Sequence, residues 1–301
     1  MTHGIHSGWD QWEDENVLWS FYKELNLKRD SVWVDTFAAV SSYIQERDNC
    51  TIKASLKGKT LTITPTCSLD SSLFKEPLTA AVTLSDGVRY FEFDPFGGAQ
   101  TYDLSNPLTG KVINVIGDSY VRNHARPFSE TWHYKAAHMN GMIYNNYGIN
   151  GSSIAYDRSA QGFGKSMLDR YVEMRHDADY ILVIAGHNDA FFVARNPEEV
   201  EERVDEFFRK LSEDYAGAKI GYVTPWRVNR DGFTEITTMA KAACEKYGVK
   251  VFDTASPDFV IDPNDADFRE KYFQGKNDTA HLTSKGHDLV VDAGEAFIKS
   301  L

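Results

Sequence analysis

Short runs of apolar residues recur along the chain from residue 111 onward, and longer stretches with helical periodicity separate them. Each run is four to six residues long, as expected of a buried strand. The predicted strands cover residues 112–116, 142–145, 180–185, 220–223 and 249–252. Strands that alternate with helices predict a parallel sheet, because parallel neighbours need a long crossover connection.

The clearest helix follows Asn196. Pro197 stands at the first helical position, Glu198 and Glu199 suit the first turn, and Asn196 is the expected N-cap. Apolar residues then recur with a helical period at Val200, Val204, Phe207, Phe208 and Leu211. Gly217 is the predicted end of this helix.

These elements predict an α/β fold class for residues 106–301. We expect a three-layer αβα sandwich around about five parallel strands joined by right-handed crossovers. Ligands bind such sheets at the carboxyl ends of the strands.

Residues 1–105 follow another pattern and predict a small, β-rich α+β unit with an accessory role. Helices are expected at residues 16–27 and 37–44. Strands are expected at residues 51–56, 61–64, 80–84 and 90–93. Residues 96–110 are rich in Gly, Asn, Pro and Thr, and they predict the linker between the two units.

Composition limits the classes of partner. With 301 residues the chain can hold two units, and its formal net charge of -12 argues against nucleic acid and anionic membrane surfaces. We therefore expect a neutral partner. No apolar stretch approaches the ~20 residues of a membrane span, and no signal peptide opens the sequence, so we expect a soluble protein.

The cysteine content leaves the cellular compartment open, and the sequence does not indicate an oligomeric state. Cys50, Cys67 and Cys244 are an odd number of cysteines without metal-ligand spacing. A disulfide between Cys50 and Cys67 is one alternative, and unpaired buried thiols are the one that we favour.

Three polar blocks stand at strand ends or before a helix. Residues 117–119 (Gly-Asp-Ser) close the run 112–116, and residues 186–189 (Gly-His-Asn-Asp) follow the run 180–185. Residues 278–281 (Asp-Thr-Ala-His) supply an imidazole with a carboxylate three residues before it. The carboxyl ends of parallel strands meet at one edge of a sheet, so these blocks are expected to lie together.

Ser119, His281 and Asp278 have the chemistry of a nucleophile, its base and the group that orients the base. A serine hydroxyl is a weak nucleophile near neutral pH and needs such a base. The three-residue spacing lets one turn carry Asp278 and His281, and Ser284 is expected to cap the following helix. The alternative is that both are ordinary surface residues, and it loses weight because the Ser119 and Asn188 blocks occur in the same chain.

Other polar residues in these blocks have plainer interpretations. His187 and His287 are competing imidazoles, but neither has a carboxylate at the spacing of Asp278. We expect both to stand away from the reacting atoms. Asp118 and Asp189 are expected to hold the loops in place by hydrogen bonds.

Together the blocks resemble the SGNH or GDSL-type serine hydrolases. Residues 117–119 match the nucleophile block, Gly151 in residues 146–151 the glycine block, Asn188 the asparagine block, and residues 278–281 the last block. The resemblance covers about residues 110 to 301. Tyr120 departs from the pattern, because a leucine often follows the serine, and this leaves subfamily and specificity open.

The resemblance implies an ester hydrolase that uses Ser119, His281 and Asp278 and needs no metal or other cofactor. It also implies an oxyanion hole formed by the backbone N–H groups of Ser119 and Gly151 and by the side-chain amide of Asn188. From the residues alone, we would take Gly151 for a turn glycine.

The start of the chain is similar to the tail of a polysaccharide deacetylase domain and its small β unit. The similarity rests on residues 2–5, 31–37 and 43–47. It implies that the chain is a fragment of a longer carbohydrate-active protein, secreted or periplasmic. Metal binding by His3 and His6 is not expected, since no acidic partner block precedes them.

We expect this hydrolase to remove O-acetyl or other short acyl groups from an oligosaccharide or small polar ester. The loops after the strands are polar, charged or aromatic, whereas a long acyl chain needs an aliphatic groove. Trp226 and Tyr272 are the aromatic residues expected to face the substrate. The alternatives are a lipase, lysophospholipase or thioesterase with the same triad, and a non-catalytic carbohydrate-binding protein.

Overall fold

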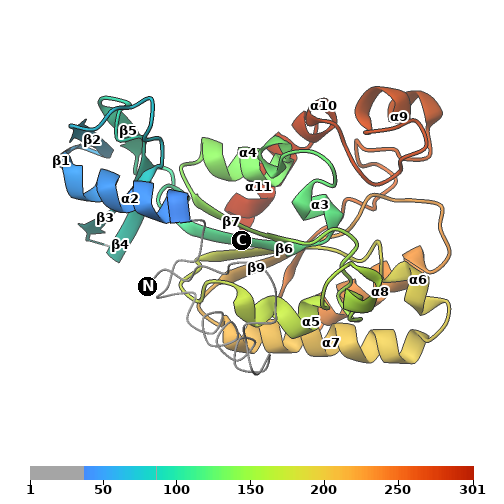
Figure 1. Ribbon diagram of the computed structural model, residues 1–301. Helices are drawn as coiled ribbons and strands as arrows, with labels where there is room; N and C mark the ends of the chain where they lie inside the picture. Colours follow the sequence, from blue (N-terminus) through green and yellow to red (C-terminus); the bar gives the residue numbers. More distant parts are fainter. Residues whose placement is uncertain (1–36, 86) are drawn as a thin grey trace, which may run out of the picture. The chain divides into compact units, whose positions relative to one another are not determined.

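The computed structural model describes residues 37–85 and 87–301 (Figure 1). The chain divides into two compact units. The first comprises the described residues up to Ser105 together with Val172–Asp177, and the second comprises Asn106–Tyr171 and Ala178–Leu301. The predicted helix at residues 16–27 and most of the segments that resemble a deacetylase tail lie outside the described residues.

The first unit combines helix α2 (Phe37–Asn49) with two antiparallel sheets. One sheet has the order β1-β2-β5 and the other is the hairpin β3-β4. The strands are β1 (Cys50–Lys57), β2 (Thr60–Cys67), β3 (Leu78–Leu84), β4 (Gly87–Phe93) and β5 (Gln100–Asp103). Alternate residues of β2 point inward, as the pleat requires. The core consists of Leu61, Ile63, Leu78, Ala80, Phe91 and Phe93.

Strand β5 corrects the predicted linker. Residues 100–103 pair with β2, from Thr60 opposite Asp103 to Ile63 opposite Gln100. The strand was missed because four residues of mixed polarity carry no readable period, and backbone pairing alone defines it.

Cys50 and Cys67 are opposite each other where β1 meets β2, yet both are free thiols. Both are only half-buried, whereas Cys244 in the second unit is fully buried. The disulfide alternative is therefore not formed in this structure.

The second unit is built on a five-stranded sheet of order β10-β9-β8-β6-β7. Its strands are β6 (Val112–Gly117), β7 (Ile143–Gly148), β8 (Tyr180–Ile184), β9 (Lys219–Val223) and β10 (Lys250–Phe252). Every pair is parallel, which confirms the predicted α/β fold. The chain leaves β6 for β7 on one side and later returns to form β8 on the other, so the order reverses between β6 and β8. A ligand site is expected outside the ends of these two strands.

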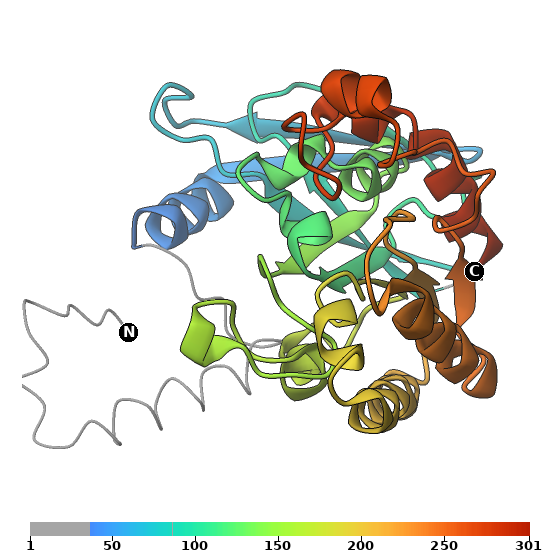
Figure 2. The ribbon, with the colours of Figure 1, turned by 90° about the vertical axis from the view of Figure 1, so that its right-hand side faces the viewer.

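Helices cover both faces of this sheet (Figures 1 and 2). Helices α4 (Trp132–Met139) and α11 (Val291–Ser300) pack together on one face, and α7 (Pro197–Asp214) and α8 (Phe233–Lys246) pack together on the other. The shorter helices are α3 (Ser119–Arg122), α5 (Met167–Arg170), α6 (Ala190–Val193), α9 (Ala266–Tyr272) and α10 (Ser284–Asp288), with 3₁₀ turns η2 (Phe128–Glu130), η3 (Ser159–Gln161) and η4 (Tyr171–Glu173).

Helix α7 follows its predicted pattern, with corrections at both ends. Its predicted apolar face is buried. Asn196 is at the N-cap position, but its side chain caps no backbone N–H and donates to the Glu199 carboxylate instead. The helix ends at Asp214, before Gly217, because the backbone leaves the helical conformation at Tyr215.

His133 joins α4 to the sheet and to the chain after β6. Its side chain is fully buried, and its Nε2 lies 3.3 Å from the carbonyl oxygen of Tyr120. Its Nδ1 lies 2.9 Å from the Tyr144 hydroxyl and 3.2 Å from that of Thr131. Burial lowers the pKa of His133 to about 3, while the contact with Tyr120 opposes this effect. The imidazole is therefore neutral at neutral pH.

This histidine should make stability depend on pH. In the unfolded chain His133 binds a proton near pH 6.5, but in the folded protein only near pH 3, so the unfolded state takes up more protons in between. Stability from this group is complete above pH 6.5 and falls by about 3 kcal/mol by pH 4. In urea unfolding, the free energy of unfolding of His133→Gln should fall less between pH 6.5 and pH 4 than that of the wild type. His138→Gln, at an exposed position of α4, is the control, and equal slopes for the two variants would contradict the assignment.

Candidate active site

Ser119 stands at the carboxyl end of β6, as its sequence position predicts. Asp118 is the N-cap of α3, and its carboxylate accepts a hydrogen bond from the backbone N–H of Tyr120 at 2.9 Å. This cap starts the helix at Ser119, whose side chain is half-exposed while its neighbours Asp118 and Tyr120 are buried.

The structure brings His281 and Asp278 to this serine. The Oγ of Ser119 lies 2.8 Å from Nε2 of His281, and Nδ1 of His281 lies 2.9 Å from Oδ2 of Asp278. The other oxygen, Oδ1, accepts hydrogen bonds from the backbone N–H groups of Ala280 and His281 at 2.8 and 2.9 Å. The three side chains form a continuous line from hydroxyl to carboxylate.

The surroundings of Asp278 favour its charged form. Burial by itself would raise the pKa of this carboxyl, but the hydrogen bonds from the His281 side chain and from the backbone of His281 and Ala280 outweigh it. The pKa of Asp278 is therefore lower than its ordinary value. An ionised Asp278 accepts the N–H at Nδ1 of His281, which leaves Nε2 free to accept the proton of the Ser119 hydroxyl.

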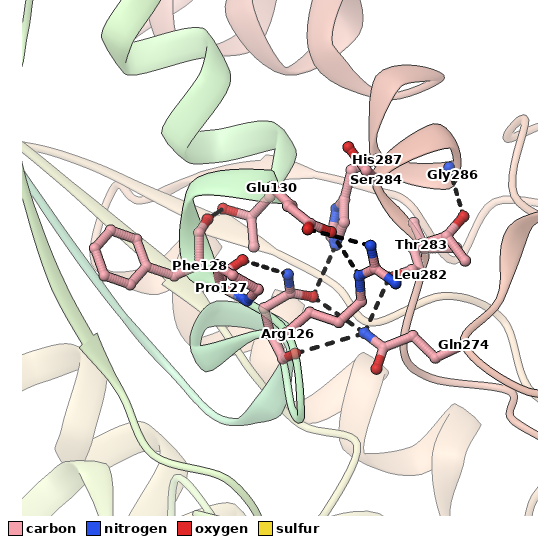
Figure 3. A network of polar contacts seen from close by, with 12 residues as sticks. Arg126, Pro127, Phe128, Glu130, Gln274, Leu282, Thr283, Ser284, Gly286 and His287 are labelled. Carbon is pink, nitrogen blue, oxygen red and sulfur yellow. Dashed lines mark hydrogen bonds and ion pairs between the residues drawn. The ribbon is translucent and has the colours of Figure 1, made fainter.

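A polar network ties the segment after Ser119 to the loop that carries His281 (Figure 3). Asn123, the C-cap of α3, accepts a hydrogen bond at Oδ1 from Gln274 at 3.2 Å and donates from Nδ2 to the carbonyl of Pro127 at 2.7 Å. Gln274 also donates from its backbone to the carbonyl of His281 at 2.8 Å, and from Nε2 to the carbonyl of Leu282 at 3.0 Å. Sequence reasoning missed Asn123 and Gln274, because neither belongs to a motif.

The expectation that Trp226 faces the substrate needs correction. Its side chain is 1% exposed, and its indole N–H donates to the carbonyl of Ala280 at 2.8 Å. The ring also packs against Tyr120, with centroids 5.2 Å apart. Trp226 therefore holds the His281 loop through its hydrogen bond to Ala280. Its ring is buried because a large apolar surface is more stable out of water.

Tyr272 is half-buried and packs on Phe268 with ring centroids 4.6 Å apart. Its carbonyl accepts hydrogen bonds from both the backbone and the side chain of Thr283. Thr283, and not Ser284, is the N-cap of α10, since its hydroxyl accepts the N–H of Gly286. Ser284 accepts a hydrogen bond from Lys135 at 2.9 Å instead.

Gly151 follows β7 in a left-handed conformation with φ of 72°. A Cβ at this position would lie 2.3 Å from ring atom Cδ1 of Phe163. Only glycine fits both constraints. Among the described residues, neither the backbone N–H of Gly151 nor that of Ser119 has a hydrogen-bond acceptor, so both are available to a ligand oxygen.

Asn188 follows β8, and its side-chain amide already donates two hydrogen bonds within the protein. Nδ2 donates to Oδ2 of Asp118 at 3.1 Å and to the carbonyl of Ser152 at 3.0 Å. Burial raises the pKa of Asp118 to about 7, although its bond from Tyr120 opposes the shift. Asn188 therefore links the loops after β6 and β7 in the state seen here.

Asp189 performs the structural task expected of it. The buried carboxylate accepts hydrogen bonds from the Ser153 hydroxyl at 2.5 Å and from the backbone N–H groups of Ile154 and Ala155, both at 3.0 Å. These bonds only partly offset burial, which raises the pKa of Asp189. Asp189 thus fixes the segment that follows Gly151.

The competing imidazoles do not contact Ser119. Burial lowers the pKa of His187 to about 4, and its Nδ1 lies 3.3 Å from the Tyr120 hydroxyl. Burial also lowers the pKa of His287, whose Nε2 lies 3.3 Å from Oδ1 of Asn123. His124 was missed as a site residue: it is exposed and stacks on His281 with ring centroids 4.3 Å apart.

Within the part of the chain that the structure describes, no three His, Cys, Asp or Glu side chains are grouped to hold a metal ion. His3 and His6 lie outside that part. None of the helices in residues 37–85 and 87–301 has the length and apolar character needed to cross a membrane.

The family profile of the "GDSL-like Lipase/Acylhydrolase family" matches residues 115–289, which is more than half of the chain. The chain belongs to this family. It is thus a GDSL-type carboxylic ester hydrolase, and its second unit has the SGNH hydrolase fold. No curated protein matches the chain.

Several solved structures are similar to this GDSL hydrolase at low sequence identity. The native aryl esterase of M. smegmatis is 17% identical with a TM-score of 0.50, and the match covers 64% of this chain and 99% of that one. A carbohydrate acetylesterase from Sinorhizobium meliloti is 14% identical with a TM-score of 0.49, over 63% of this chain and 99% of that one. Another crystal structure is 19% identical with a TM-score of 0.55, and the match covers 65% of this chain and 99% of that one.

Replacement of Gly151 by alanine should lower the stability and activity of this GDSL hydrolase more than replacement of a glycine whose added Cβ would have no neighbours. Gly151→Ala combines left-handed backbone strain, about 1–3 kcal/mol, with the contact to Phe163. Gly162→Ala is the matched control, because its φ is 82° but nothing lies within 4 Å of the added Cβ. The free energy of unfolding in urea and the turnover of p-nitrophenyl acetate should both be lower in Gly151→Ala than in Gly162→Ala. Equal losses in the two variants would contradict the close contact.

Proposed function

We propose that this GDSL hydrolase removes acetyl or other short acyl groups from a carbohydrate ester, with Ser119 as nucleophile, His281 as general base and Asp278 as its orienting group. The observation that carries the proposal is the pair of contacts at 2.8 and 2.9 Å that connects the Ser119 hydroxyl through His281 to Asp278. Nucleophile, base and orienter within hydrogen-bond reach are the geometric signature of covalent acyl transfer.

In the first half of the reaction, Oγ of Ser119 attacks the ester carbonyl carbon while its proton passes to Nε2 of His281. The carbonyl oxygen gains the negative charge. When the tetrahedral intermediate collapses, the bond to the alcohol oxygen breaks and His281 returns the proton to the leaving alcohol. A carboxylate at Asp278 stabilises the imidazolium that exists between these steps.

In the second half, water attacks the acyl-Ser119 ester and gives its proton to His281. Collapse releases the carboxylic acid and restores the hydroxyl of Ser119. The backbone N–H groups of Ser119 and Gly151 would hold the oxyanion in both halves, since both are free of protein acceptors among the described residues. Asn188 would join them by releasing its hydrogen bond to Asp118.

The side chains around these groups favour a short acyl group on a polar alcohol. His124 stacks on His281, Arg158 donates to the carbonyl of Gly151, and Arg230 donates to the carbonyl of His187. None of them offers the aliphatic surface that would capture about 0.8 kcal/mol per buried methylene of a long chain. The ring of Phe163, 39% exposed beside Gly151, is a surface on which a sugar ring can stack.

The first unit would then be accessory. Ser119, Gly151, Asn188, Asp278 and His281 all belong to the second unit.

Removal of the nucleophile or the base should abolish ester hydrolysis without unfolding the protein. Ser119→Ala and His281→Gln should each lower turnover of p-nitrophenyl acetate by at least ~10³-fold, as expected when a triad member is lost. Wild type should be labelled by a fluorophosphonate probe, and Ser119→Ala should not. His138→Gln, on α4, is the control. Labelling of Ser119→Ala, or wild-type turnover in it, would contradict the assignment of Ser119 as nucleophile. A wild-type protein without turnover and without labelling would leave a non-catalytic binding protein as the alternative.

The acyl preference is tested with a series of p-nitrophenyl esters from acetate to octanoate. We expect kcat/KM to fall as the chain lengthens, because His124, Arg158 and Arg230 offer no aliphatic surface to bury the added methylenes. A higher kcat/KM for octanoate than for acetate would replace the acetylesterase proposal with a lipase or thioesterase.

A further inference from the structure

Two arginines are anchored beside the residues proposed to hold the oxyanion. Nη1 of Arg158 donates to the carbonyl oxygen of Gly151 at 2.7 Å. Nη1 of Arg230 donates to the carbonyl oxygen of His187, the neighbour of Asn188, at 3.2 Å. These bonds fix each guanidinium near the place where the ester carbonyl would lie, and they leave further N–H groups on both side chains.

Neither arginine forms an ion pair with a carboxylate of the described residues. Arg126, Arg175 and Arg209 do so, with Glu130, Asp177 and Glu213 respectively. The chain has 44 acidic and 32 basic residues, so carboxylates are abundant. Arg158 and Arg230 differ from these three because each donates to a backbone carbonyl beside a residue proposed to hold the oxyanion.

Arg158 is also partly withdrawn from water. Its guanidinium lies 4.5 Å from the ring centroid of Phe163 and 5.7 Å from that of Phe192. Burial lowers the pKa of Arg158, the charge of Asp189 opposes this, and the charge of Arg230 adds to it. The two guanidiniums thus lie within electrostatic reach of each other. A charge in such a place is costly without a counter-ion and attracts an anion more strongly than it would in water.

The nearby carboxylates are occupied by other groups. Asp189 accepts hydrogen bonds from residues 153–155, and Asp118 accepts them from Tyr120 and Asn188. Neither makes a hydrogen bond or ion pair with Arg158 or Arg230 among the contacts of the described residues. Asp189 and Asp118 act on Arg158 through their charge alone and do not bond to it, so N–H groups of both guanidiniums remain for an anion from outside the protein.

We propose that Arg158 and Arg230 bind an anionic group of the substrate, so that the natural substrate is an O-acyl ester of an acidic sugar. This proposal rests on the proposed function. Guanidinium groups pair with carboxylate or phosphate through two parallel hydrogen bonds, and a uronic acid or a sugar phosphate would supply the anion. The net charge of the chain pointed to a neutral partner, but recognition depends on the charges at the site and not on their sum.

The test compares three esters that differ in charge: acetylated glucose, acetylated glucuronic acid and acetylated glucose 6-phosphate. With wild-type protein we expect kcat/KM to be roughly tenfold or more higher for an anionic ester than for the neutral one, the effect of one charge-assisted hydrogen bond. The preference should shrink as salt is added. The ranking of the two anionic esters separates carboxylate from phosphate recognition.

Variants then assign the preference to the two arginines. The ratio of kcat/KM for the anionic ester to that for the neutral ester should fall about tenfold in Arg158→Gln and in Arg230→Gln. Arg209→Gln is the matched control, because it removes the same charge from α7, where Arg209 pairs with Glu213. Its ratio should equal that of wild type. A ratio unchanged in Arg158→Gln and Arg230→Gln overturns the proposal.

Equal wild-type rates for the neutral and anionic esters would also overturn it and would leave the esterase function intact. Loss of all ester hydrolysis and of fluorophosphonate labelling would instead be a failure of the proposed function. A binding measurement decides the anion site in that case. Calorimetric titration of Ser119→Ala with acetylated glucuronic acid should show binding that is absent with acetylated glucose and is lost in Ser119→Ala/Arg158→Gln/Arg230→Gln. Equal binding of the two sugars would refute the anion site.

Discussion

The site depends on one contact between distant parts of the chain. Ser119 and His281 are 162 residues apart in sequence, and a hydrogen bond of 2.8 Å joins their side chains. Such a bond has little strength on exposed and mobile side chains, so both segments must be held before it forms. Gln274 fixes the His281 loop to Asn123, at the end of the helix that Ser119 begins, and Trp226 fixes the carbonyl of Ala280. The reacting geometry is therefore a property of the supporting contacts.

Buried carboxylates hold the loops at the point where the strand order reverses. Asp118 follows β6 and Asp189 follows β8, and both are fully buried. Burial raises the pKa of each carboxyl, which shows the cost of withdrawing it from water. Hydrogen bonds from backbone N–H groups offset part of this cost and fix the loops in one conformation. Asp118, which precedes the proposed nucleophile Ser119, thus has a structural part in the same block.

His133, His187, His281 and His287 show how the surroundings of an imidazole decide its role. Burial lowers the pKa of His133 to about 3 and that of His187 to about 4, and it lowers the pKa of His287 as well. These three are neutral and act as fixed hydrogen-bonding groups. Only His281 has both a carboxylate at Nδ1 and a serine hydroxyl at Nε2. A count of histidines in the sequence could not separate these roles, but the Asp278 spacing could.

The sequence by itself determined the order of strands and helices in the second unit and marked Ser119, Asp278 and His281 as candidates for one site, where their side chains meet. These features are local: a buried strand needs a run of apolar residues, and the motif residues stand at fixed offsets from such runs or from each other. Only the tertiary structure decided the β5 pairing, the burial of Trp226, the hydrogen bonds of Asn188 and the bonds from Arg158 and Arg230 to backbone carbonyls. Each of these depends on which side chains meet across long stretches of chain, and the periodicity of a single segment carries no record of its partners.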